Sequence, residues 1–338
     1  MGKKSEAAKT EKQVQEFRDT FVRMSDEISK VIVGYKDIID NVLTALMSRG
    51  NVLLEGVPGI GKTMLVRTLG EVLDLRFRRV QFTADLMPAD IVGTNMISQD
   101  EAGNRTFRFE RGPVFTHLLR ADEINRATPK TQSALLEAME EHSVTVAGTQ
   151  YVLDEPFFVL ATQNPIEMEG TYPLPQAELD KFIFKLDVPF PGLDDLDEII
   201  VRTTYEEMPP VDVVAKGEDI LELRKLVRQV PIAPHVEDYA ARTILATSPV
   251  SEFATDMVKR YVRAGSSPRG LQGLILAGKV KALLDGRYAV SCDDIDEMAH
   301  ATLRHRVQRN LEAEAEEISP DAIVSDILEK TPQTAEAA

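Results

Sequence analysis

The sequence predicts an α/β fold, a parallel sheet between two layers of helices in a three-layer sandwich, followed by an all-α lid domain. One observation is a complete match of residues 56–63 to the phosphate-loop pattern G-x-x-x-x-G-K-[ST]. Another is the alternation of strand-like and helix-like segments from residue 51 to residue 186, which is typical of a parallel sheet. Beyond Pro191-Gly192 the apolar spacing is helical throughout, which indicates a separate helical domain.

The phosphate loop has the strand and the helix that its chemistry needs. Asn51–Glu55 before it is predicted to be a buried strand, and apolar residues recur at helical spacing from Met64 onward. Glycines let the loop turn its N–H groups toward phosphates, and the helix N-terminus adds its positive end. Lys62 then neutralises the β/γ-phosphates and the Thr63 hydroxyl ligates Mg²⁺. The residues expected to contact the nucleotide are Gly56, Val57, Pro58, Gly59, Ile60, Gly61, Lys62, Thr63 and Met64. The fold is therefore predicted to be that of a P-loop NTPase, with ATP and Mg²⁺ as cofactors.

The segment before the first strand is predicted to be mostly helical. Residues 1–13 are expected to form a disordered leader, and the core domain to span 14–191. An amphipathic helix is predicted from Phe17 and a second helix over Lys36–Met47. Between them, Ile32 and Val33 either form a wall for the adenine ring or pack in the core.

Polar residues follow two of the predicted central strands. Asp122 and Glu123 end the strand that begins near Phe115, about sixty residues after the phosphate loop. The aspartate is expected to orient the Mg²⁺ shell and the glutamate to polarise the attacking water. Asn164 follows the strand 157–161, where it would hold that water or sense the γ-phosphate, or else act as a capping residue. Arg120 is unusual, because a central parallel strand should be apolar.

The remaining core elements complete the alternation. They are a strand over 79–83, a β-like stretch over 95–109, a helix from Thr128-Pro129, a hairpin over 143–153 and a fifth strand over 182–186. The lid is predicted over 192–310 with helices at 194–205, 219–229, 235–246, 252–263, 269–284 and 292–308. Arg269 lies in the first turn of one of these helices, where it either reaches a phosphate at the domain junction or remains a surface arginine. Residues 311–338 form an acidic segment with a short helix from Ser319, expected to dock on the lid.

Composition restricts the class of protein. The chain has 338 residues, a net charge of −16 and 43% hydrophobic residues, and no apolar run long enough to span a membrane. The acidic balance argues against a nucleic-acid partner held over a broad surface. A polar N-terminus and a single cysteine, Cys292, favour a cytoplasmic location.

With these segments assigned, the chain resembles the MoxR family of AAA+ ATPases over residues 31–328. The resemblance is carried by the segments 53–59, 82–93, 112–115, 121–127, 131–139, 161–165, 172–175 and 267–270. It assigns Lys62 and Thr63 to Walker A, Asp122 and Glu123 to Walker B, Asn164 to sensor 1 and Arg269 to sensor 2. It also implies a helix-2 insertion around 95–110, as in the helix-2-insert clade, and a hairpin before sensor 1. A ring, usually hexameric, and a chaperone-like action on a protein client, often one with a von Willebrand factor A domain, are implied as well.

The chain departs from the family pattern at one cationic position. Members commonly have Leu-Asp-Arg-Phe where this sequence has Leu179-Asp180-Lys181-Phe182. That arginine resembles a finger acting on the neighbouring subunit, and lysine keeps the charge but lacks the planar fork. Either Lys181 serves as the finger, or Arg126 or Arg111 replaces it, or the lysine is a surface substitution. Arg120, where most relatives have an apolar residue, is expected to contact a neighbouring subunit.

The predicted function is an ATPase that hydrolyses ATP to drive remodelling or maturation of a protein client, including metal or cofactor insertion. The alternative is a DNA motor or a Mg-chelatase-like metal-insertion subunit, which share the insertion and the hairpin. The hairpin segment 144–150 has no Lys or Arg to grip a phosphate backbone, which argues against a DNA motor. A small-molecule kinase or a GTPase is less favoured, because the sequence has no Asn-Lys-x-Asp motif for guanine.

Overall fold

The computed structural model describes residues 2–57, 61–99, 105–164, 170–205 and 209–333. The strands are β1 (Asn51–Glu55), β2 (Phe77–Gln81), β3 (Gly93–Gln99), β4 (Arg105–Arg111), β5 (Leu118–Asp122), β6 (Ser143–Val146), β7 (Thr149–Val152), β8 (Phe158–Gln163), β9 (Phe182–Asp187), β10 (Val262–Ala264) and β11 (Gln308–Arg309). The helices of the first part are α1 (Gly2–Val31), α2 (Lys36–Met47), α3 (Lys62–Val72), α4 (Pro88–Val92), η1 (Ile124–Arg126), α5 (Pro129–Glu141) and α6 (Gln176–Leu179). Those of the second part are α7 (Leu193–Ile200), η2 (Val201–Tyr205), α8 (Gly217–Gln229), α9 (Pro234–Ala246), α10 (Asp256–Tyr261), α11 (Pro268–Leu284), α12 (Cys292–Leu303), α13 (Leu311–Ala315) and α14 (Pro320–Lys330).

Five parallel strands form the central sheet in the order β2-β5-β8-β1-β9. Because β8 lies between β1 and β5, the phosphate-loop strand and the acidic strand are separated by the strand that ends at Gln163. In parallel strands the carboxyl ends meet at one edge of the sheet, and ligands of open α/β sheets bind there. This order brings the three predicted functional strand ends together.

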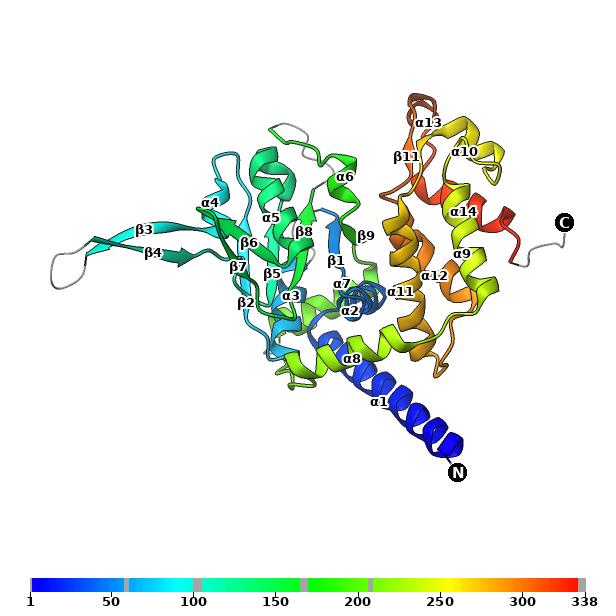
Figure 1. Cartoon of the computed structure of the whole chain (residues 1–338), viewed down its shortest axis with the longest axis horizontal. Coiled ribbons are helices and arrows are strands. Elements are labelled where there is room, and N and C mark those ends of the chain that lie inside the picture. The colour runs from blue at the N-terminus through cyan, green and yellow to red at the C-terminus, as the bar shows by residue number, and fades with distance from the viewer. Residues whose placement is uncertain (1, 58–60, 100–104, 165–169, 206–208, 334–338) are drawn as a thin grey trace.

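Alternating side chains of the sheet pack into two separate cores, as strand geometry requires. Leu54 and Leu160 face a core shared with α1, α2, α3 and the lid helices. Leu53 and Val159 face a second core covered by α4 and α5. The predicted three-layer sandwich is confirmed, and Figure 1 shows the sheet between these helical layers.

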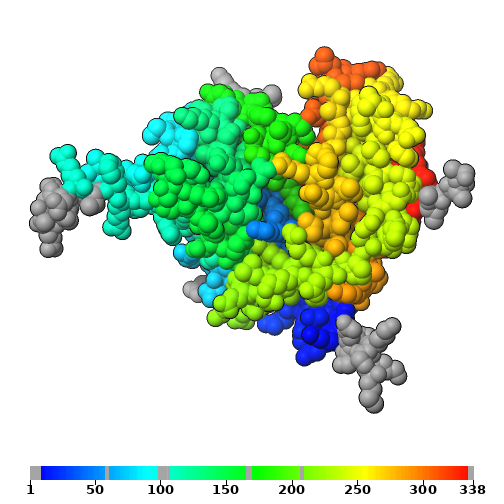
Figure 2. All heavy atoms as spheres, in the orientation of Figure 1, coloured from blue at the N-terminus to red at the C-terminus, as the bar shows by residue number. Residues whose placement is uncertain are grey.

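The helical lid lies beside the core domain, and the two lobes are visible in Figure 2. α11 packs against α12, α9 and α1, and α12 packs against β9, so the lid rests on both the sheet and the N-terminal helix. α14 packs on α12 and α9 with Ile323, Val324 and Ile327 buried. The lid also contains a short antiparallel ribbon, β10–β11, where only helix was expected.

The N-terminal prediction needs correction. Helix α1 begins at Gly2, so the residues expected to form a disordered leader, 1–13, are helical from residue 2 onward. Its apolar stripe, which includes Phe17, Phe21 and Met24, is buried against the core, so the helix has a packing partner.

An antiparallel hairpin made by β3 and β4 extends away from the sheet on the side opposite the lid (Figure 1). Its base is closed by Gly93 and Gly112. Gly93 has a φ of +98°, and a Cβ there would lie 2.2 Å from the Glu110 carbonyl oxygen, so only glycine fits. Assigning this hairpin to the helix-2 insertion remains a prediction. In the parts of the chain that the structure describes, no helix is both long and apolar enough to cross a membrane.

Candidate active site

The phosphate loop joins β1 to α3 at the carboxyl edge of the sheet. Gly61 precedes α3 with a φ of +83°, a left-handed conformation that favours glycine. Lys62 begins the helix, and its Nζ donates a hydrogen bond to the Gly56 carbonyl oxygen, so the ammonium lies over the loop. Pro58, Gly59 and Ile60 lie outside the described residues. The described part of the loop therefore has the strand–loop–helix order that phosphate binding requires.

The strand ends converge as the sheet order predicts. A cavity of about 430 Å³ at this edge is lined by Gly56, Gly61, Lys62, Thr63, Met64, Arg67, Arg79, Gln81, Arg120, Asp122, Glu123, Thr162, Gln163 and Asn164. This volume is within the range of small-molecule sites. The structure thus brings Lys62, Thr63, Asp122, Glu123 and Asn164 into one cavity, although they are spread over about a hundred residues of sequence.

Glu123 is held by its main chain and its side chain. Its φ is +54°, a conformation that costs a non-glycine residue of the order of 1–3 kcal/mol and that clusters at functional sites. The Glu123 N–H donates to Thr162 Oγ1 (3.0 Å), and Gln81 Nε2 and Arg126 Nη1 each donate to Glu123 Oε2 (2.9 Å). The two side-chain hydrogen bonds hold the Oε2 atom of the Glu123 carboxylate in place.

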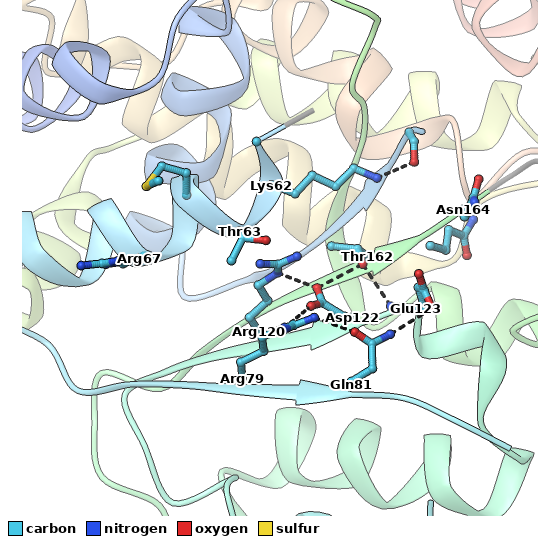
Figure 3. Close-up of a pocket in the computed structure, with 14 residues that line it drawn as sticks. Lys62, Thr63, Arg67, Arg79, Gln81, Arg120, Asp122, Glu123, Thr162 and Asn164 are labelled. Atoms are coloured by element: carbon cyan, nitrogen blue, oxygen red, sulfur yellow. Dashed lines mark hydrogen bonds and ion pairs between the residues drawn. The ribbon is translucent and has the colours of Figure 1, made fainter. Parts of the chain in front are cut away.

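Two arginines contact the other carboxylate, Asp122. Arg79 Nε donates to Asp122 Oδ2 at 2.6 Å, and Arg120 Nε lies 2.5 Å from Asp122 Oδ1. Thr162 Oγ1 lies 3.5 Å from the same Oδ1. Figure 3 shows both guanidinium groups directed at this carboxylate. Arg120 is 6% exposed and lines this cavity, where it contacts Asp122 of its own chain, and the expected contact with a neighbouring subunit stays a prediction.

The site is strongly cationic. Burial lowers the pKa of Lys62, and the nearby charge of Arg120 lowers it further, while Asp122, Glu55 and Glu123 raise it. Burial also lowers the pKa of Arg120, an effect that Asp122 opposes. Cations that oppose one another in a partly buried cavity are stabilised by an anionic ligand, as phosphate groups would be.

The residues predicted for Mg²⁺, Thr63 and Asp122, both line this cavity. A hydroxyl and a carboxylate are hard oxygen donors of the kind Mg²⁺ uses with nucleotide phosphates. Each Asp122 oxygen lies close to an arginine, so the carboxylate binds cationic groups in this structure. The donor set therefore fits Mg²⁺.

The residues predicted to line the adenine differ in position. Ile32 lines a small apolar hollow next to the phosphate loop, together with Tyr35, Leu54, Gly61 and Lys62. Val33 is only partly buried and is not among the residues of that hollow. The apolar surface next to the loop is thus provided by Ile32 rather than by the pair.

Lys181 and Arg269 lie in a second cavity, apart from Lys62. This cavity of about 280 Å³ is formed where the ends of α2 and α5 meet the start of β9 and α11. Lys181 Nζ lies 2.9 Å from Glu178 and 3.5 Å from Glu140, and Arg269 donates to the same Glu140. The two cations share one carboxylate.

The other finger candidates lie elsewhere. Arg126 contacts its own Glu123, and the Arg111 guanidinium lies 5.0 Å from the centre of the Phe115 ring. Neither lines the second cavity.

Sequence reasoning missed Arg79, Gln81 and Thr162 as site residues. Arg79 and Gln81 were predicted only as residues of the strand 79–83, and Thr162, which follows the predicted strand 157–161, was given no role. Their roles follow from the pairing of β2 with β5, which aligns Gln81 with Asp122, and from the position of β8 beside β5. In the sequence, the one signal for these positions is that polar Arg79 and Gln81 flank apolar Val80, a pattern that indicates a strand with one face exposed to solvent.

A phosphate loop, an acidic strand end and a polar sensor strand on a five-stranded parallel sheet, followed by a helical lid, define a P-loop ATPase of the AAA+ class. Residues 51–184 match the family model "ATPase family associated with various cellular activities (AAA)", and residues 254–327 match the model "AAA lid domain". The lid match crosses residue 310, and the predicted domain boundaries remain predictions.

Individual relatives narrow the class. The chain is 40% identical to Chaperone MoxR1 of Mycobacterium tuberculosis, over 92% of this chain and 81% of that protein. It is 29% identical to Protein MoxR of Methylorubrum extorquens, over 91% of this chain and 94% of that one. A crystal structure from Cytophaga hutchinsonii, 39% identical, superposes with a TM-score of 0.90 over 98% of this chain and 99% of that chain. The chain belongs to the MoxR family of AAA+ ATPases, whose AAA domain implies nucleotide binding, and the cavity next to Lys62 is the candidate site for it.

Proposed function

We propose that this ATPase assembles into a ring, hexameric as is usual in the family, and uses ATP hydrolysis to remodel or mature a protein client in the cytoplasm. The proposed client class is a protein with a von Willebrand factor A domain, and maturation includes insertion of a metal or cofactor. The observation that carries this proposal is the separation of charges into two cavities. One cavity holds Lys62, Asp122 and Glu123, and the other holds Lys181 and Arg269.

Within one subunit, the proposed chemistry is positioning and charge stabilisation. Lys62 and the N–H groups at the start of α3 bind the β/γ-phosphates. Thr63 and Asp122 would hold Mg²⁺, which when bound neutralises charge developing on the phosphates. Glu123 takes a proton from the attacking water, and Asn164 orients that water. Gln81 and Arg126 keep the Glu123 carboxylate in place through its Oε2.

Between subunits, we propose that Lys181 and Arg269 act on the nucleotide of the neighbour. A head-to-tail interface, which closes into a ring, would bring this second cavity to the next subunit's phosphate loop. Support comes from the shared Glu140 contact, which keeps the two positive charges together at one place. Arg269 therefore serves the neighbouring site in this proposal, rather than reaching the phosphate of its own subunit.

The hydrolytic role of Glu123 is tested by Glu123→Gln. The amide cannot accept the proton of the attacking water, so turnover is expected to fall about 10²–10⁴-fold while ATP affinity is retained. Phosphate release and calorimetric titration measure the two quantities, and Glu329→Gln, an exposed glutamate on α14, is the control. Normal turnover in Glu123→Gln would remove the glutamate from this role.

The client is tested with the same variant, which is expected to stay loaded with ATP. A purified von Willebrand factor A domain protein from the same organism should bind Glu123→Gln with ATP more tightly than with ADP. Equal binding in both states would contradict remodelling driven by the nucleotide. Stimulation of turnover by DNA instead would favour the DNA motor.

A further inference from the structure

Arg120 is a buried charged group in the nucleotide site to which the proposed chemistry gives no role. It lies on β5, a central strand of the sheet, and its side chain is 8% exposed. Such a strand normally carries apolar residues, and a buried guanidinium is costly unless it is paired. Its Nε forms an ion pair with Asp122 Oδ1 at 2.5 Å, but both Nε and Nη1 are buried with no hydrogen-bond partner among the described residues. A buried donor without a partner indicates that part of this group is meant for a ligand.

The neighbouring strand places a second arginine beside it. In the register of β2 and β5, Arg79 pairs directly with Arg120, and like charges in this position repel each other. One carboxylate, Asp122, lies against both. Of the charged residues described in this cavity, Lys62, Arg67, Arg79 and Arg120 are cationic, and only Asp122 and Glu123 are anionic. The surplus of positive charge calls for a ligand with several negative charges.

The position of Arg120 makes it a rival of the metal. Arg120 and Asp122 are two residues apart on one strand, so their side chains leave the same face of the sheet. Figure 3 shows the Arg120 guanidinium directed toward the side of the cavity where Thr63 and Lys62 lie. It therefore lies on the side of Asp122 that faces Thr63, the other residue predicted to hold Mg²⁺. There it contacts a carboxylate oxygen that Mg²⁺ would use.

We propose that Arg120 is a resident cation of the nucleotide site: its guanidinium binds the phosphates of a nucleotide that arrives without metal, and it releases Asp122 when Mg²⁺ is present. The inference rests on nucleotide binding in this cavity. Two consequences distinguish this site from a phosphate loop with one lysine. Compared with a site that has only the lysine, nucleotide binding depends more weakly on Mg²⁺. Turnover requires a higher concentration of free Mg²⁺, because the metal must displace a guanidinium from Asp122.

The test is an affinity measurement in which no turnover is needed. ADP is titrated calorimetrically into wild type and Arg120→Met, once with EDTA and once with saturating Mg²⁺. Loss of one charge-assisted hydrogen bond predicts that the variant binds ADP at least about tenfold more weakly in EDTA. With saturating Mg²⁺ the difference in ADP affinity between wild type and Arg120→Met should shrink to about threefold or less, because the protein then makes one hydrogen bond fewer to the nucleotide. Free Mg²⁺ at half-maximal turnover should be lower in the variant than in wild type.

Two further variants make the result specific. Arg78→Met removes an exposed arginine from β2 on the opposite face of the strand and should change neither affinity. Arg120→Lys keeps the charge and should lose less affinity in EDTA than Arg120→Met, and it serves as the test if the methionine variant does not fold. Equal losses in EDTA and in Mg²⁺, or no loss in EDTA, would overturn the proposal. If wild type bound ADP under neither condition, the nucleotide site itself would be contradicted, which is a different failure.

Discussion

His305 shows how one buried residue makes the junction between lid and core sensitive to acid. It is 6% exposed, and its Nε2–H donates to the Phe182 carbonyl oxygen of β9 at 3.0 Å. Burial holds the pKa of His305 well below its ordinary value, and the charges of Arg306, Lys185 and Arg304 lower it further. The imidazole is therefore neutral in the folded protein.

The neutral state of His305 in the folded protein predicts a loss of stability in mild acid. Below about pH 6.5 an unfolded chain protonates His305 while the folded chain does not, so the unfolded state binds more protons and is favoured. Wild type should lose up to about 1.4 kcal/mol more per pH unit between about pH 6.5 and 5 than His305→Gln, which can still donate to Phe182. Urea unfolding across this range measures the slope, with the exposed His235→Gln as control. Parallel curves for wild type and His305→Gln would contradict this account.

At the residue scale, the site residues that could be predicted from the sequence are those that belong to a local sequence motif. Lys62 and Thr63 follow from the glycine pattern, and Asp122 and Glu123 from their place at a strand end. Arg79 carries no such pattern, because it reaches Asp122 only through the pairing of β2 with β5. Long-range pairing is not visible in a single sequence, so this part of the site needed the structure.

At the element scale, the segment after α12 joins the lid to the sheet through Arg306. This side chain is 2% exposed. It donates to the carboxylate of Asp180 at 2.8 Å and to the carbonyl oxygens of Asp180, Phe182, Ile183 and Thr302. Asp180 in turn accepts from Ser267 Oγ at the start of α11. One guanidinium thus connects α12, β9 and α11.

Removal of that guanidinium should loosen the lid. Arg306→Met leaves the Asp180 carboxylate without its buried partner, and breaking such a pair costs about 3–5 kcal/mol. We expect a lower melting temperature and faster amide exchange in α11 and α12 than in α5. The exposed Arg263→Met on the lid is the control and should leave both unchanged. Unaltered exchange in α11 and α12 would show that the helices hold the lid without Arg306.

Most helices and strands could be predicted from the sequence, because burial of one face gives the apolar residues a regular spacing. The five sheet strands lie within a few residues of their predicted positions, because buried strands are short apolar runs between turns. The helix predicted over 252–263 is reduced to α10, since residues 262–264 pair with β11. The expected leader is helical as a continuation of α1, whose buried residues from Val14 onward pack in the core, a tertiary effect that its polar first residues do not indicate.

At the scale of the whole molecule, the phosphate loop and the Lys181–Arg269 pair lie in different cavities of one chain. A cation that contributes to phosphoryl transfer must reach the phosphates. If these two cations take part, as we propose, each subunit supplies a loop to one seam of the ring and a cationic pair to the next. A single subunit then holds two halves of different active sites.

Mixing two inactive variants tests this arrangement. Lys181→Ala keeps a complete loop but lacks the proposed cation, and its turnover should fall at least about tenfold. Glu123→Gln lacks the proposed base but keeps Lys181. In an equal mixture, about a quarter of the seams in a head-to-tail ring join an intact Glu123 to an intact Lys181, so phosphate release should rise well above the sum of the separate variants. Lys181→Ala mixed with a double Lys181→Ala, Glu123→Gln variant is the control and should not recover, because no subunit then supplies the lysine. Recovery absent from the first mixture would mean that Lys181 acts within its own subunit or not at all.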